Sequence, residues 1–442
     1  MMAGYARATT WLLAATAMGA ATSAAQSRLP SANTSVIYLD SKSLASLPLP
    51  FPSRSFGEQP FVTANGSVLN TSVSTSSLAG GFNATSVNQF HVYDAELAAP
   101  ILGSDPSVHL MVYEQGYAFA HEAPVYFPDT QDIYFCSDAG GARGRSGADQ
   151  NNVVFKLNLD NIEAKLRNNT EPTFAQDVTE VEINSDGVQM TNGGTNYNRS
   201  LLLINSGRTE AYPPSIALVD RDQPANVRVL LNNAAGRQFN ALNDVVVHPK
   251  TGAIFFTDAW YGQTQGFRPQ VDLPLAVWRF DPNSGTLTAL TDPSVVSVPN
   301  GLAFSPEGDT LYVSDTSPIY NGVTSPNATH PASIYAFGVN TDIDSGFQWL
   351  GPRRVFAWPE TGIADGIKVD TQGNVYTGTG DGVSVFSKHG KPILKVFMPQ
   401  TGGVNLVFAQ HGRLVVTAQE RIFLVQLGPS VTGPPIWDYP YN

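Results

Sequence analysis

The chain has 442 residues, a formal net charge of −12 at pH 7 and a pI of about 5.0. This acidic balance argues against nucleic acid as a partner, because phosphate binding requires a basic surface. Glycine (39 residues) and proline (31 residues) are abundant and only 14% of residues are charged, a composition typical of many short strands joined by turns.

The N-terminus has the pattern of a secretory signal peptide over residues 1–25. Arg7 precedes an apolar run over residues 11–21, and small residues lead to a predicted cleavage after Ala25. The alternative is an ordinary apolar N-terminal helix. No second long apolar run follows, so we expect no membrane span. Residues 26–90 are rich in Ser, Thr, Asn and Pro and predict an extended N-terminal arm with few strands.

Seven N-x-S/T sequons support secretion and predict a glycoprotein. Their asparagines are Asn33, Asn65, Asn70, Asn83, Asn168, Asn198 and Asn327.

From residue 91 to 442, strand-turn-strand units recur at intervals of about 40 to 70 residues, the scale of propeller blades. Hairpin turns with a glycine at the position that needs positive φ occur at residues 249–252, 305–308 and 370–373. Additional strands are predicted at residues 276–280, 333–337 and 383–386. The six repeat centres lie near Glu122, residues 192–198, Asn243, Asn300, Asp365 and Asn405.

Four strands per unit, repeated six times, predict an all-β fold: a six-bladed β-propeller with four-stranded blades and an N-terminal extension. The alternative architecture is a β-helix, which would need shorter and more regular repeats. Residues 158–167 form the one short helix expected.

An oxygen-bearing side chain stands near the start of several predicted innermost strands, which line the central channel of a propeller. Glu122, Asn243, Asn300 and Asp365 would converge there as two carboxylates and two amides. Such a set suits Ca²⁺, with another divalent cation as the alternative. Zinc or copper would favour His or Cys ligands. Singly, each Asn or Asp could merely cap a turn, but four at equivalent places favour a metal site.

A cation with an open face can polarise an ester carbonyl, and Asp365 is the predicted general base for an attacking water. The chain has no G-x-S-x-G motif, which argues against an α/β-hydrolase. Its single cysteine, Cys136, lies in an apolar strand and is predicted to be a buried core residue.

Four further residues are weaker candidates for substrate contact: His121, Asn192, Asn196 and Tyr261. Strand alternation could turn His121 away from the channel. The two asparagines could instead serve turn structure, and Tyr261 could instead pack between blades.

Six motifs, in this order and spacing, resemble the family of senescence marker protein 30, gluconolactonase and related propeller lactonases, most closely its secreted fungal lactonohydrolases. The resemblance covers roughly Phe90 to Leu427. The motifs are FAHEAPVY at residues 119–126, TNGGTNY at 191–197, NDVVV at 243–247, FTDAWYG at 256–262, PNGLAFSP at 299–306 and DGIKVD at 365–370.

The resemblance implies a six-bladed propeller with a catalytic calcium in the central channel. It implies Glu122, Asn300 and Asp365 as metal ligands, with Asn243 as a ligand in several members, and Asp365 as the acid/base residue. Three positions depart from the family pattern. Ala123 replaces a common glycine, Ala259 replaces a frequent proline, and Arg237 is off register for the family's substrate-contacting arginine. These changes leave the metal site intact and the substrate open.

Three hypotheses follow. The chain is a secreted, calcium-dependent lactone hydrolase whose partner is a small-molecule lactone. Alternatively, it is a tailoring enzyme of secondary metabolism that acts on a polyketide-type lactone or anhydride. As a third option, it is a non-catalytic binding propeller with structural calcium, since a fold alone does not decide function. The oligomeric state remains open.

Overall fold

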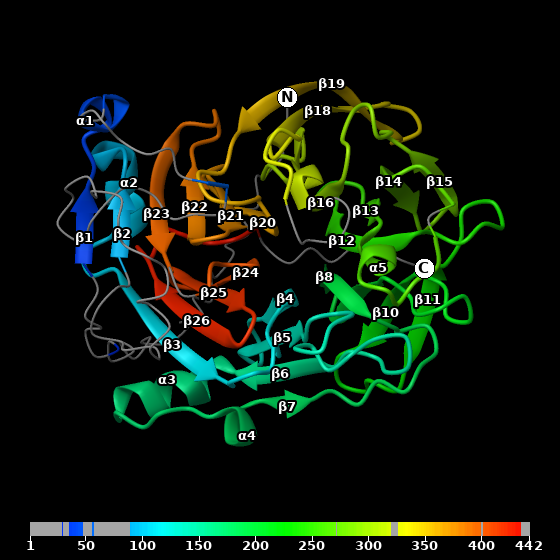
Figure 1. Ribbon diagram of the computed structural model, residues 1–442, viewed down its shortest axis with the longest axis horizontal. Coiled ribbons are helices and arrows are strands. Elements are labelled where there is room, and N and C mark those ends of the chain that lie inside the picture. Colours follow the sequence, from blue (N-terminus) through cyan, green and yellow to red (C-terminus); the bar gives the residue numbers. More distant parts are fainter. Residues whose placement is uncertain are drawn as a thin grey trace, which may run out of the picture.

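Six β-sheets are arranged around a central axis in the computed structural model (Figure 1). The structure describes residues 35–46, 89–270, 272–319, 326–398 and 401–434, together with residues 29, 55 and 56. The predicted signal peptide, most of the N-terminal arm, and the sequons at Asn33, Asn65, Asn70 and Asn83 lie outside these residues. The predicted six-bladed β-propeller is confirmed.

The blades are numbered in chain order, and the innermost strand is given first in each. Blade 1 contains β4 (Glu122–Phe127), β5 (Asp132–Cys136), β6 (Val154–Asn158) and β7 (Thr179–Glu180). Blade 2 contains β8 (Thr191–Tyr197), β9 (Ser200–Asn205), β10 (Ser215–Asp220) and β11 (Val227–Leu231). Blade 3 contains β12 (Ala241–Val247), β13 (Ile254–Ala259), β14 (Ala276–Asp281) and β15 (Thr286–Ala289). Blade 4 contains β16 (Pro299–Phe304), β17 (Thr310–Asp315), β18 (Ile334–Thr341) and β19 (Gln348–Ala357).

The last two blades each recruit strands from the N-terminal part of the chain. Blade 5 contains β20 (Ile367–Val369), β21 (Val375–Thr379), β22 (Gly382–Phe386) and β23 (Pro392–Phe397), and β2 (Gln89–Val92) and β1 (Ser35–Tyr38) extend its outer edge. Blade 6 contains β24 (Asn405–Ala409), β25 (Arg413–Ala418), β26 (Arg421–Gln426) and, as its outermost strand, β3 (Ser107–Tyr113).

The ring is closed by β3, which pairs antiparallel with β26 and joins the two ends of the propeller in one sheet. The sequence repeat did not predict this pairing, because β3 belongs to no strand-turn-strand unit of its own. Hydrogen bonds between distant parts of the chain therefore hold the first and last blades together.

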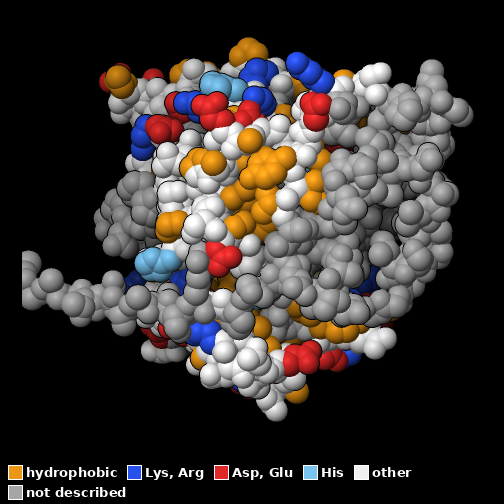
Figure 2. Space-filling view, turned by 90° about the vertical axis from the view of Figure 1, so that its left-hand side faces the viewer, with side chains coloured by type: hydrophobic (Ala, Val, Ile, Leu, Met, Phe, Trp, Pro, Cys, Tyr) orange, Lys and Arg blue, Asp and Glu red, His pale blue; other side chains and the backbone are white. Residues whose placement is uncertain are grey.

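The side of the molecule that carries β1 and β2 also carries α1 (Ser41–Ala45) and α2 (Ala95–Leu102), on the left of Figure 1. Helix α2 buries one face between blades 5 and 6. Figure 2 views the molecule from this side, where hydrophobic side chains gather between charged ones.

The remaining helical segments are short and lie in connections between strands. They are α3 (Leu159–Arg167), α4 (Phe174–Asp177), α5 (Tyr261–Thr264) and the 3₁₀ turn Ser317–Ile319. The predicted helix over residues 158–167 corresponds to α3, which Asn158 caps through its side chain. Among the described residues, no helix has the length and apolar character needed to cross a bilayer.

The apolar core consists of clusters between neighbouring blades, because each sheet buries both of its faces. Strand β9 shows the pattern: Leu202 and Ile204 face blade 3, whereas Leu201 and Leu203 face blade 1. This alternation of two buried faces explains why these strands read as continuous apolar runs in the sequence.

Candidate active site

A β-bulge interrupts several innermost strands near their starts. In β4, Glu122 pairs with Cys136 and Val125 pairs with Tyr134, so two residues oppose one on β5. Equivalent register shifts lie at residues 242–245 of β12 and 299–302 of β16. A bulge re-aims a side chain that regular alternation would place on a sheet face. The bulges of β12 and β16 therefore contain the predicted ligands Asn243 and Asn300, whereas Glu122 is the paired residue just before the bulge of β4.

Side-chain hydroxyls on the second strand of a blade tie these bulges to the next blade. In blade 3, Thr257 Oγ accepts a hydrogen bond from the Asp244 N–H at 3.0 Å and donates to the Asn300 carbonyl at 2.9 Å. In blade 4, Ser314 Oγ donates to the Asp365 carbonyl at 3.3 Å. The backbones of Asn300 and Asp365 are thus each positioned by a hydroxyl of the preceding blade.

Glycines after the ligand positions allow neighbouring strands to approach closely. A Cβ on Gly301 would lie 2.2 Å from the Asp365 carbonyl oxygen. A Cβ on Gly366 would lie 2.3 Å from Cγ of Asn405. Real Cβ atoms do not approach other atoms this closely, so only glycine fits directly after Asn300 and directly after Asp365.

Two acidic side chains near the strand starts, Glu122 and Asp365, influence each other electrostatically. Glu122 is 3% exposed, and burial, together with the charges of Asp365 and Asp244, raises its pKa well above the ordinary value. Burial raises the pKa of Asp365 to about 6, against the opposing influence of His121 and of a hydrogen bond from Asn300. The Asp365 residue is half-buried. Two carboxylates that raise each other's pKa favour a positive partner.

The two predicted amide ligands differ in their hydrogen bonding. Asn300 donates from Nδ2 to Tyr261 Oη at 3.2 Å, and its side chain also bonds to Asp365. These contacts leave Oδ1 of Asn300 as the atom available for a cation. Oδ1 of Asn243 is buried and has no hydrogen-bond partner among the described residues. A buried acceptor without a partner is costly, and a cation would satisfy it.

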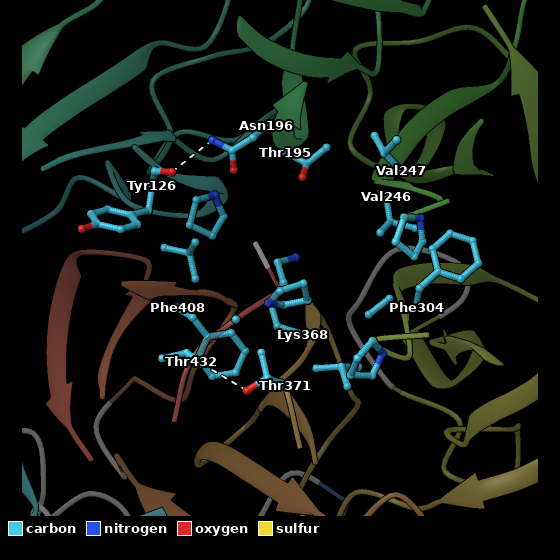
Figure 3. A pocket seen from close by; sticks show the side chains of 18 of the residues that line it. Tyr126, Thr195, Asn196, Val246, Val247, Phe304, Lys368, Thr371, Phe408 and Thr432 are labelled. Atoms are coloured by element: carbon cyan, nitrogen blue, oxygen red, sulfur yellow. Dashed lines mark hydrogen bonds between the residues drawn. The ribbon is translucent and has the colours of Figure 1, made fainter. Parts of the chain in front are cut away.

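The predicted substrate-contact residues lie in different places. His121 influences Asp365 electrostatically, and its Nε2 lies 3.5 Å from Asp138 Oδ1. Tyr261 contacts Asn300 and Thr316, which makes it a positioning residue for Asn300. Asn192 donates to the Asn243 carbonyl at 3.0 Å and so lies at the metal end of β8. Asn196 donates to the Tyr126 carbonyl at the opposite end of the channel (Figure 3). Direct substrate contact by these four residues stays a prediction.

Three residues around the acidic pair escaped the sequence analysis as members of the site. Asn405 donates to Glu122 Oε2 at 2.6 Å from the start of the sixth innermost strand. The Asp244 carboxylate accepts the Val245 and Leu302 N–H groups and so bridges blades 3 and 4. Asp138 Oδ1 lies 3.5 Å from Nε2 of His121. The repeated polar residue at each strand start was the signal that could have identified Asn405.

Several other predicted residues lie away from the acidic pair. Cys136 is buried and donates to the Thr191 carbonyl at 3.1 Å, which confirms its prediction as a core residue. Arg237 forms an exposed ion pair with Asp272. Asn168 and Asn327 are exposed, and Asn198 is half-buried.

Fold and site together define a six-bladed propeller with oxygen donors gathered at one mouth of its channel. The family model described as the SMP-30/gluconolactonase/LRE-like region matches residues 211–420 of this chain. Lactonohydrolase oryL of Aspergillus oryzae is 31% identical over 341 residues, which cover 72% of this chain and 70% of that protein. Lactonohydrolase oryH of the same organism is 24% identical over 392 residues, covering 72% and 76% of the two chains.

Solved structures share the propeller fold. A gluconolactonase from Xanthomonas campestris superposes with a TM-score of 0.56 at 25% identity, covering 76% of this chain and 94% of that one. A calcium-binding regucalcin from Agrobacterium tumefaciens shares the fold, with a TM-score of 0.52 at 16% identity, covering 75% and 99% of the two chains. The chain belongs to the SMP-30/gluconolactonase/LRE-like family, a family of lactonase-like hydrolases.

Proposed function

We propose that the protein is a calcium-dependent hydrolase that opens lactone rings. The observation that carries this proposal is the oxygen set at the strand starts: two interacting carboxyls with raised pKa values and the partnerless Asn243 Oδ1. Carboxylate and amide oxygens are the donors that Ca²⁺ prefers. Glu122, Asn243, Asn300 and Asp365 would hold the ion. The relatives named as lactonohydrolases and gluconolactonases support the substrate class.

The chain's own residues supply the remaining chemistry. A divalent cation bound at such a site polarises the ester carbonyl and stabilises the oxyanion that develops on it. Asp365 would accept a proton from the attacking water, and a carboxyl whose pKa is raised toward neutrality is a more effective base. Asn300 holds Asp365 in place, and the Tyr261 hydroxyl orients Asn300. His121, with Asp138 beside it, lies where it could contact the substrate.

The test is a panel of aldono-, γ- and δ-lactones assayed with calcium and after complete removal of metal by a chelator. We expect activity to require the metal and Asp365→Asn to lower kcat by several orders of magnitude. Asp272→Asn is the matched control, because Asp272 is exposed and pairs only with Arg237 in the described structure. Full activity after metal removal would reject the metal mechanism. Calcium binding without turnover of any lactone would favour the binding propeller.

We also propose that the protein is secreted and glycosylated. The N-terminal signal pattern and the exposed sequons at Asn168 and Asn327 support this proposal. Expression in a eukaryotic host should deliver the protein to the medium, cleaved after Ala25. An endoglycosidase should then lower its mass, and Asn168→Gln should remove one glycan. Intracellular retention with an intact N-terminus would contradict secretion.

A further inference from the structure

A cavity of about 510 Å³ lies at the end of the central channel opposite Glu122 and Asp365 (Figure 3). Its volume falls in the range of small-molecule sites. All six innermost strands contribute to its wall, so it lies on the propeller axis. One wall residue from each strand, in blade order, is Tyr126, Asn196, Val246, Phe304, Val369 and Phe408.

The cavity wall is mostly apolar, and several of its polar groups already have partners. Asn196 donates to the Tyr126 carbonyl at 3.0 Å. The Thr371 and Thr432 hydroxyls bond to each other at 3.1 Å. These groups therefore place little demand on a ligand, which leaves Lys368 as the charged group of the wall.

Lys368 lies at the centre of β20, between the buried residues Ile367 and Val369, and its side chain extends into the cavity (Figure 3). No hydrogen bond or ion pair is made by its ammonium within the part of the chain that the structure describes. An ammonium has three donors and no acceptor. Leaving it half-buried without an acceptor is unfavourable, so the cavity favours a ligand that brings one.

The two acids whose pKa values respond to Lys368 do not serve as hydrogen-bond acceptors for its ammonium. Glu122 and Asp244 both feel the charge of Lys368, but Glu122 takes its hydrogen bond from Asn405 and Asp244 accepts backbone N–H groups. Their negative charge also disfavours a multiply charged anion close by. A single carboxylate attached to an apolar chain fits both the ammonium and the carbon walls.

We propose that this cavity is a second ligand site, separate from the metal end of the channel, and that it binds a small amphiphilic carboxylate. The carboxylate pairs with Lys368 Nζ, and the apolar chain lies against Val246, Phe304 and Phe408. The site does not depend on the hydrolase activity proposed above.

Isothermal titration of the full-length protein with octanoate tests the proposal, with 1-octanol as the uncharged ligand of the same chain length. Lys368→Met should weaken octanoate binding about tenfold or more, the scale of a charge-assisted hydrogen bond, and should leave octanol binding within about twofold. Lys368→Arg keeps the charge and should retain octanoate. Lys250→Met is the matched control, because Lys250 is exposed and outside the cavity wall.

A variant with a large side chain in the cavity shows at which end of the channel octanoate binds. Thr195 lies in the cavity wall, and Thr195→Trp should abolish binding of both ligands. Circular dichroism and thermal melting check that each variant is folded. Octanoate binding that survives Thr195→Trp would place the carboxylate at the metal end and overturn the proposal. Equal affinity for octanoate in Lys368→Met and the unmodified protein would overturn it as well.

Discussion

Lys395 in β23 is buried in blade 5 and neutralises two acids, so its loss should be among the most destabilising changes on this side of the propeller. Its side chain is 1% exposed, and Nζ lies 2.7 Å from both Asp381 Oδ2 and Glu360 Oε2. The Asp381 side chain is fully buried. Lys395→Met keeps the aliphatic stem and removes the charge. The substitution leaves Asp381 with two threonine hydroxyls and no cation.

Removal of one partner from a buried ion pair costs about 3 to 5 kcal/mol, because the remaining charge is uncompensated. Lys391 provides the matched control. It stands just before the same strand and pairs with Asp94, but its side chain is 62% exposed. Lys391→Met should therefore cost no more than about 1 kcal/mol.

Urea unfolding followed by tryptophan fluorescence, at one fixed calcium concentration, measures both changes. A rescue variant sharpens the experiment. Asp381→Asn added to Lys395→Met removes the stranded charge and should recover most of the lost stability. If Lys395→Met shifts the midpoint no more than Lys391→Met does, or if the double variant recovers nothing, the buried-charge reasoning is refuted.

Three further predictions follow from the site and the core. Asn243→Ala should leave the calcium-free protein about as stable as before, because a partnerless buried acceptor is removed, but should reduce the rise in Tm that calcium produces. Burial lowers the pKa of His248 to about 4 in the folded state. At this site the unfolded state then binds more protons between pH 6.5 and 4, so the contribution of His248 lowers stability by up to about 3 kcal/mol as pH drops through this window. His248→Gln should flatten that slope in urea titrations. Gly301→Ala should destabilise the protein by about 2 kcal/mol or more, because the added Cβ would clash with the Asp365 carbonyl oxygen. Ala123→Gly should change stability by less than about 1 kcal/mol, because Ala123 has φ of 55°, a conformation that glycine adopts without strain.

The repeat plan could be predicted from the sequence because each hairpin is a local feature. Glu122, Thr191, Pro299 and Asn405 are strand residues at or beside the predicted repeat centres, and each lies at the start of an innermost strand. A hydrophobic alternation and a turn glycine suffice to specify such a unit. The ring closure by β3 could not be predicted in this way, because its partner β26 lies about three hundred residues further along the chain.

Depth along the channel was the harder property to predict. Asn192 and Asn196 stand in one strand and one motif, yet four residues in a strand span about 13 Å. They consequently contact the two opposite ends of the channel. Tyr261 likewise follows a strand in sequence, but its hydroxyl reaches Asn300 of the next blade. Such contacts between blades depend on the close approach of the innermost strands, which the sequence signals only through glycines such as Gly301.

The bulges account for the different chemistry of the two channel ends. At the strand starts, Asn243 and Asn300 lie within the bulged segments, and the Asn300 side chain bonds to Asp365 of the acidic pair. Beyond the bulge the register is regular again, and residues such as Val246 and Phe304 form a wall that is mostly carbon. The bulge thus separates an oxygen-lined end from an apolar end on the same six strands. Substitutions in the apolar wall should therefore leave calcium affinity unchanged, and loss of a metal ligand should leave the distal cavity intact.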